Sequence, residues 1–197
     1  ERRARQAGQL GIRAAEARLN SGIAHAEPSG RRTDGGPLQQ KARHVDNGRP
    51  NVMTLSWLTL LEFEPPLVGC VISKRDHSFA AVAASGECVI NIPTLELADA
   101  VVDCGNASGT DTDKLATFGM ISLPANQVQA PLIAECFAKL ECRVGDPSMV
   151  SRYGLFVLEV VRAWIQPDAK NHPTLHHRGH GAFMRAGETI ALPSKMK

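Results

Sequence analysis

The stretch from Glu135 to Val144 constrains the fold of this chain most strongly, because polar and apolar side chains alternate along it. Successive side chains of a strand point to opposite faces, so the pattern predicts a strand with one face against a core. Phe137 is the one exception. A second stretch, Leu155 to Ile165 (LFVLEVVRAWI), is apolar almost throughout, which predicts a long and mostly buried strand. The apolar face of the first strand consists of Cys136, Ala138, Leu140, Cys142 and Val144.

The other expected elements are short. A helix that starts near Thr94, as its N-cap, should end at Gly105, and Gly86 should end an earlier helix. Strands do not alternate regularly with long helices, which argues against a doubly wound parallel sheet. We therefore expect a mainly β fold with short helices, arranged as a small barrel. The expected strands cover residues 52–61, 67–73 and 87–92 and two short pieces within 182–192, and the expected helices cover 77–85, 94–104 and 111–118.

Charge divides the chain near Gly48. Residues 1–50 hold ten Lys or Arg and five Asp or Glu, whereas the remainder holds twelve and fifteen. Residues 1–47 contain few large apolar side chains and the turn-rich segment EPSGRRTDGG. We expect a flexible basic extension over 1–47 and one folded domain over 48–197. A transit peptide and a segment that contacts nucleic-acid phosphates remain open for the extension, although the net charge of +2 gives no reason to expect a nucleic-acid partner.

Cysteine usage and hydropathy indicate the compartment. The chain has five cysteines, an odd number, and no pair is spaced C-x-x-C, so we expect reduced thiols in the cytoplasm. No apolar run approaches the roughly 18 residues that a membrane span requires, so no membrane association is expected.

A series of motifs carries a resemblance to a known family. The motifs are NVMTLSW at 51–57, PPLVGCVISKRDHS at 65–78, ECVINIP at 87–93, CGNASG at 104–109 with Asp113 and Lys114, APLIAE at 130–135, LEC at 140–142 and TLHH at 174–177. No single motif is decisive, but their order and spacing are specific. Over about 150 residues, from Gly48 to Met196, the chain closely resembles the flavin reductase-like FMN-binding family, which includes the flavoredoxins. The resemblance implies an FMN-binding split β-barrel.

The resemblance implies three groups of cofactor-binding residues. The first is the strand Asn51, Val52, Met53, Thr54, Ser56 and Trp57 beside the flavin ring; a core strand with a buried Trp is the alternative. The second is the turn and helix start Ser73, Arg75, His77 and Ser78 at the FMN phosphate; a plain capped helix is the alternative. The third is a loop over the flavin with Cys104, Gly105, Ser108 and Lys114, in which Lys114 could equally be a solvated loop lysine.

Two features stand apart from these motifs. His172, His176, His177 and His180 cluster around two glycines, but no carboxylate or thiolate shares the segment, so we expect contacts near the flavin rather than a metal site. Relatives in the family begin with an apolar strand just before the first motif. Here that place holds QQKARHV, and no substitute strand is evident upstream. Closure of the barrel is therefore in question.

The function implied by the resemblance is redox chemistry on a bound flavin. We expect an NAD(P)H-dependent flavin reductase or a flavoredoxin-like electron transfer protein, with FMN as cofactor and a flavin or other electron acceptor as partner. A non-catalytic FMN-binding or redox-sensing module is the alternative. Hydride transfer to flavin needs no general base or nucleophile, and none is evident. We also expect a homodimer, because the two longest strands present more apolar surface than one small barrel can cover.

Overall fold

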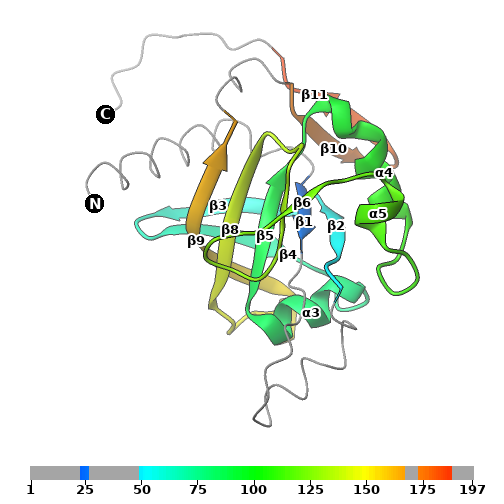
Figure 1. Cartoon of the computed structure of the whole chain (residues 1–197). Coiled ribbons are helices and arrows are strands. Elements are labelled where there is room, and N and C mark those ends of the chain that lie inside the picture. Colours follow the sequence, from blue (N-terminus) through cyan, green and yellow to red (C-terminus); the bar gives the residue numbers. More distant parts are fainter. Residues whose placement is uncertain (1–22, 27–48, 167–172, 188–197) are drawn as a thin grey trace, which may run out of the picture.

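A computed structural model describes residues 23–26, 49–166 and 173–187. Its central element is an antiparallel sheet of seven strands in the order β2-β1-β5-β8-β9-β4-β3 (Figure 1). The mainly β fold with short helices, expected from the sequence, is confirmed. The strands of this sheet are β1 (Ile23–Ala26), β2 (Val52–Leu55), β3 (Leu58–Phe63), β4 (Pro66–Val71), β5 (Glu87–Ile92), β8 (Ala138–Asp146) and β9 (Leu155–Ile165).

The remaining elements are short and lie around the sheet. Strands β6 (Ser122–Leu123) and β7 (Leu132–Ile133) form one small pair, and β10 (Leu175–Gly179) and β11 (Ala182–Arg185) form another. In Figure 1, α4 and α5 lie beside β2, α3 lies at one end of the sheet, and the β10–β11 pair lies near α4. The helices are α3 (His77–Ser85), η1 (Leu95–Leu97), α4 (Ala98–Asn106), α5 (Lys114–Thr117) and α6 (Val150–Tyr153).

Strand β1 corrects the expectation that no strand precedes the first motif. Its four residues pair with β2 on one side and with β5 on the other, both antiparallel. It therefore occupies an internal position in the sheet (Figure 1). Within the segment 1–47, expected as a flexible extension, Ile23–Ala26 therefore form part of the sheet. The rest of that segment lies outside the described residues.

The stretch 52–61, expected as one strand, is divided between the two edges of the sheet. Strand β2 forms one edge and β3 the other, and only Ser56 and Trp57 connect them. The chain thus crosses between the two edges within two residues. No ladder joins β2 to β3 directly, so the sheet curves without closing, as in a split barrel.

The interior of the barrel follows the alternation seen in the sequence. Leu140 and Cys142 of β8 point inward and pack with Ile90, Phe156 and Leu158 from the neighbouring strands, all essentially inaccessible to solvent. Apolar side chains of this size each contribute roughly 1.5–3 kcal/mol when buried. The period-two prediction is confirmed over 138–144. The expected start at Glu135 is wrong, because Cys136 lies before β8 and packs with Val52 and Cys104 instead.

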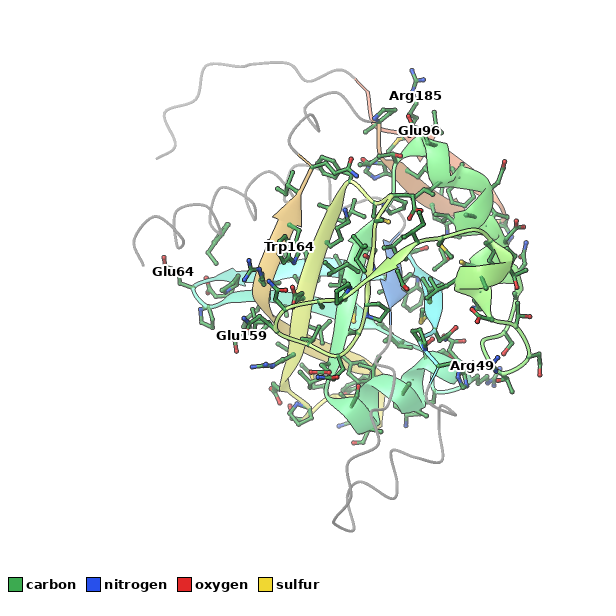
Figure 2. The ribbon with its side chains drawn as sticks, in the orientation of Figure 1. Arg49, Glu64, Glu96, Glu159, Trp164 and Arg185 are labelled. Carbon is green, nitrogen blue, oxygen red and sulfur yellow. The ribbon has the colours of Figure 1, made fainter. Side chains whose placement is uncertain are left out.

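The opposite face of β5 and β8 is covered as well, by a strap formed by residues 124–134. Val128, Ala130 and Leu132 of the strap are buried against Val89 of β5 and pack with Trp164 of β9. Figure 2 shows Trp164 on this side of the sheet. Because the strap covers it, the polar face of β8 is buried too: Glu141 is fully buried and Lys139 nearly so.

Of the three helix ends expected from the sequence, one is confirmed and two differ. Helix α3 ends as expected, with Gly86 in the left-handed region at φ 70° and its N–H donating to Val82 O. Thr94 precedes η1, but its side chain makes no capping hydrogen bond. Helix α4 then runs through Gly105 to Asn106. Gly105 therefore lies inside the helix, where a glycine is tolerated although it forms helix weakly.

Among the described residues, no helix is long and apolar enough to cross a membrane. All five cysteines are buried, and the structure pairs none of them in a disulfide bond. The second strand piece expected within 182–192 falls on residues beyond 187, which lie outside the described residues.

Candidate functional site

Strand β2 and the residues next to it form the centre of the candidate site. Val52 is fully buried and packs with Cys104, Leu115 and Cys136, which joins β2 to α4 and α5. Met53 packs partly against the barrel interior. The alternation of the strand therefore places Val52 under the helices.

Asn51 lies just before β2 and is buried against α3. Its Nδ2 donates to Ser78 Oγ at 3.3 Å, and both side chains are at least nine-tenths buried. The other amide atom, Oδ1, has no hydrogen-bond partner. The amide oxygen and nitrogen can exchange places by a flip, so either way one buried polar atom is left for a further partner.

The loop after α4 closes over Asn51. Gly109 contacts the Asn51 amide so closely that a Cβ at this position would lie 2.7 Å from Nδ2 and nearer still to Oδ1. In the same loop, Thr110 Oγ1 lies 3.5 Å from His77 Nδ1. Ser108 Oγ is held locally, since it accepts a hydrogen bond from Thr110 N. The loop after α4 thus meets the residue before β2 through Gly109 and the start of α3 through Thr110.

Thr54 connects β2 to α4. Its Oγ1 donates to Val101 O at 2.6 Å. A Cβ on Gly105 would lie 3.5 Å from Thr54 Oγ1. The hydroxyl hydrogen of Thr54 is therefore used inside the protein. Only the oxygen lone pairs of Thr54 remain to accept a hydrogen bond from a ligand.

The start of α3 has no side-chain cap. Asp76 is the N-cap residue, but its side chain makes no capping hydrogen bond. Ser73 Oγ instead accepts from Arg75 N in the preceding turn, and both residues are exposed. No side chain therefore caps the first turn of this nine-residue helix, in which Phe79 N donates to Asp76 O. The helix dipole favours negative charge at this end.

Lys114 is buried rather than solvated. Its Nζ donates to Cys104 O at 2.9 Å, one of the last carbonyl groups of α4. A cation at this end of a helix is favourable because the carbonyl groups there are unpaired and carry partial negative charge. Burial raises the pKa of the Cys104 thiol to about 11, and Lys114 opposes part of this shift. The alternative of a solvated loop lysine is wrong.

Ser56 and Trp57 lie where the chain passes from one sheet edge to the other. Ser56 Oγ lies 2.9 Å from Nδ1 of His177, a residue 121 positions later in the chain. Trp57 is 71% exposed, and its carbonyl accepts a hydrogen bond from Val71 N. The alternative of a core strand with a buried Trp is therefore wrong.

The structure brings most of the expected site residues together but not all. Asn51, Thr54, His77, Ser78 and Lys114 each contact a neighbouring element of the site, whereas Ser73 and Arg75 form a separate exposed turn. Sequence reasoning assigned no role to Gly109 and Thr110, although Gly109 ends the motif CGNASG and Thr110 follows it directly. The small residues of that segment were the available signal for a close approach.

The histidine cluster is divided by the structure. His176 is buried and His177 faces Ser56, as expected for neighbours on a strand, while His180 is exposed at the hairpin tip. His172 lies outside the described residues. Within the described part of the chain, no group of three His, Cys, Asp or Glu side chains could hold a metal ion.

Comparison with known sequences identifies the family. The family described as flavin reductase like domain matches residues 42–184, so this chain belongs to that family. An uncharacterized protein of Archaeoglobus fulgidus is 34% identical over 113 residues, which are 57% of this chain and 64% of that protein. The uncharacterized protein YddH of Escherichia coli is 31% identical over 155 residues, 72% of this chain and 82% of that protein. The match thus spans under two thirds of the Archaeoglobus relative.

Solved structures show the same fold. An FMN-binding domain of a flavin reductases-like enzyme from Shewanella baltica has a TM-score of 0.77 at 24% identity, covering 94% of this chain and 95% of that one. Flavoredoxin of Desulfovibrio vulgaris has a TM-score of 0.71 at 17% identity, covering 89% and 91%. The NADH:FAD oxidoreductase SgcE6 of Streptomyces globisporus has a TM-score of 0.65 at 18% identity, covering 90% and 93%.

Proposed function

We propose that this protein binds FMN and acts as an NAD(P)H-dependent flavin reductase or as a flavoredoxin-like electron transfer protein. The observation that carries the proposal is the unpaired, buried amide atom of Asn51, located between Ser78 and Gly109. Buried polar groups are normally paired, so an orphan in a family of flavin-binding folds indicates a place that a ligand completes. The family membership supports the same conclusion.

The polar groups of the site suit the different parts of FMN. The flavin ring and ribityl chain require neutral donors and acceptors, which the lone pairs of Thr54, the amide of Asn51 and the hydroxyl of Ser56 supply. A phosphate requires N–H donors, which the uncapped start of α3 supplies. His77 at the same end adds a hydrogen-bonding side chain, and Arg75 lies exposed in the turn before the helix.

The bound flavin would supply the two-electron redox chemistry, and the protein would supply binding and orientation. The β2 segment would hold the ring and ribityl chain, and the start of α3 would hold the phosphate. No G-x-G-x-x-G segment follows a strand in the sequence, so a nicotinamide donor would bind against the flavin rather than in a dinucleotide fold of its own.

The absorption spectrum of the purified protein tests the cofactor, and mass analysis after heat release identifies it. We expect FMN. The proposal would be refuted if well-folded protein releases FAD, haem or no cofactor and also fails to bind added FMN. Steady-state oxidation of NADH and NADPH with added flavin then separates a reductase from an FMN-binding module with little turnover.

We also propose that the protein is a homodimer that associates through β3. This edge strand of the sheet carries large apolar side chains that are exposed: Leu60, Leu61 and Phe63, with Trp57 just before it. The β3–β4 hairpin extends to one side of the barrel in Figure 1. Large apolar side chains exposed along an edge strand are typical of protein interfaces.

Light scattering on the eluting protein tests the oligomeric state. Leu61→Glu together with Phe63→Glu should convert a dimer to a monomer, because charges would be buried without partners in the interface. Glu62→Gln, on the same strand, is the matched control and should leave the dimer intact. A monomeric wild-type protein at micromolar concentration would contradict the proposal.

A further inference from the structure

The β10–β11 hairpin is fastened to the body of the protein at its base. Thr174 forms a bridge with Thr94, and Leu95 N donates to Pro173 O. Ala186 N donates to Thr174 O, which adds a further pair to the two strands at this base. Figure 2 shows Arg185 of β11 and Glu96 of η1 at the same end of the molecule. The start of the hairpin therefore has a defined position relative to η1 and α4.

One side chain connects this hairpin to the segment between β2 and β3. His177 Nδ1 lies 2.9 Å from Ser56 Oγ. The imidazole ring is also packed against Phe183 of β11, with ring centroids 5.0 Å apart and an interplanar angle of 46°. The two contacts together fix both the position and the plane of the imidazole.

The partner of a hydroxyl group determines what the hydroxyl offers to a ligand. Ser56 has one hydrogen and two lone pairs. If it donates its hydrogen to an unprotonated Nδ1, it offers only lone pairs to a further partner. If Nδ1 carries a hydrogen and donates, Ser56 is free to donate its own. His177 thereby decides whether Ser56 acts as a donor or as an acceptor.

We propose that His177 is a positioning residue that orients the Ser56 hydroxyl toward the bound flavin and links the β10–β11 hairpin to the cofactor. This inference rests on the proposed function, since Ser56 belongs to the segment assigned to the flavin. Ser56 is exposed, so its hydroxyl is accessible to a ligand while it contacts His177. His177 itself acts through Ser56 and is not a catalytic residue.

Four variants test the proposal by titration of the apoprotein with FMN, followed by flavin fluorescence and by the visible spectrum of the bound flavin. His177→Phe keeps a ring against Phe183 but has no ring nitrogen, and it should weaken FMN binding roughly three- to tenfold. His177→Asn retains a polar atom near the position of Nδ1 and should restore most of the affinity. The FMN affinity of Ser56→Ala should equal that of the Ser56→Ala/His177→Phe double variant, because the second change removes a contact that is already lost.

His180→Asn is the matched control. It is the same substitution on the same hairpin, at an exposed position with φ 51° that Asn tolerates. It should leave the FMN affinity and the flavin spectrum unchanged, and thermal unfolding of every apoprotein separates a folding defect from a binding defect.

Unaltered FMN affinity and spectrum in His177→Phe would overturn the positioning role. So would additive losses in the double variant, or a His177→Asn protein as weak as His177→Phe. A wild-type protein that binds no FMN would instead refute the proposed function and, with it, this inference.

Discussion

Asn51 and Gly109 lie so close together that a side chain at position 109 would overlap the Asn51 amide, with a Cβ only 2.7 Å from Nδ2. The contact brings the loop after α4 onto the residue that precedes β2. It also places the backbone of this loop next to the one unpaired amide atom of Asn51. A glycine at position 109 is therefore required by the shape of the candidate site.

Gly109→Ala should displace Asn51 from Ser78 and open the loop. Overpacking of this kind costs about 1–3 kcal/mol, so the free energy of unfolding should fall by that amount. FMN affinity should also decrease, because the Asn51 amide is moved. Urea denaturation and FMN titration measure the two effects. Gly105→Ala is the control for stability, since its Cβ would be in ordinary contact with Thr54 and alanine favours helix there. Equal effects of the two substitutions would show that the close approach is unimportant.

Ser78→Ala should weaken FMN binding by roughly ten- to hundredfold if the hydroxyl lies at the phosphate, because a hydrogen bond to a charged group contributes about 1.5–3 kcal/mol. Thr54→Val should have a smaller effect on binding. It should also lower stability by about 1 kcal/mol, since the hydrogen bond to Val101 O is lost. FMN titration and thermal unfolding separate these outcomes.

Ser122→Ala serves as the control for Ser78→Ala, because Ser122 is exposed in β6. Unchanged FMN titrations for both Ser78→Ala and Thr54→Val would show that the cofactor is assigned to the wrong residues.

Glu141 should be essential for the strap over residues 124–134. Its buried carboxylate accepts hydrogen bonds from Trp164 Nε1 at 2.7 Å and from the backbone N–H groups of Asn126 and Gln127. Glu141→Gln replaces one acceptor oxygen by an NH₂ group facing these donors. The substitution should cost about 1–3 kcal/mol for each donor left unpaired and should speed hydrogen exchange in the strap.

Glu159→Gln is the matched substitution on the neighbouring strand, where the side chain is exposed (Figure 2). It should change neither thermal stability nor exchange. A Glu141→Gln protein with wild-type stability would contradict the anchoring role.

Two buried thiols should make stability depend on alkaline pH. Burial raises the pKa of Cys104 to about 11 and of Cys136 to about 12, from an ordinary value of 9.0. Above pH 9 the unfolded chain loses protons that the folded protein keeps, so the free energy of unfolding should fall as the pH rises toward 11–12. Urea denaturation at several pH values measures the slope, which should be smaller for the Cys104→Ala/Cys136→Ala protein.

The same two thiols should react slowly with iodoacetamide at neutral pH, because the reactive form is the thiolate. Denaturation in urea should make both react rapidly. Fast labelling of either thiol in the native protein would contradict the burial described here.

Removal of residues 1–46 should destabilise the protein. The shortened chain lacks β1, which pairs four residues with β2 and three with β5. Ladder hydrogen bonds contribute roughly 0.5–1.5 kcal/mol each, so the loss should be about 3 kcal/mol or more. Removal of residues 1–19 keeps β1 and is the control. Equal stability of the two shortened proteins would show that β1 is dispensable.

Local patterns were sufficient for much of the fold. The alternation in 135–144, the apolar run 155–165 and Gly86 predicted β8, β9 and the end of α3, because each depends on neighbouring residues along the chain. The ordered motifs also placed Asn51, Thr54 and Ser78 in one site. The structure brings them together around β2.

Contacts between distant residues were decided by the tertiary structure alone. The four residues of β1 have no alternation long enough to predict a strand, and they are ordered as one by pairing with β2 and β5. Ser56 meets His177 across 121 positions, and Glu141 is buried because a strap from elsewhere covers it. Sequence by itself determined the strands and motifs that local periodicity encodes. Which edges pair, which polar groups become buried and which side chains meet depended on long-range packing, where burial and pairing outweigh local preference.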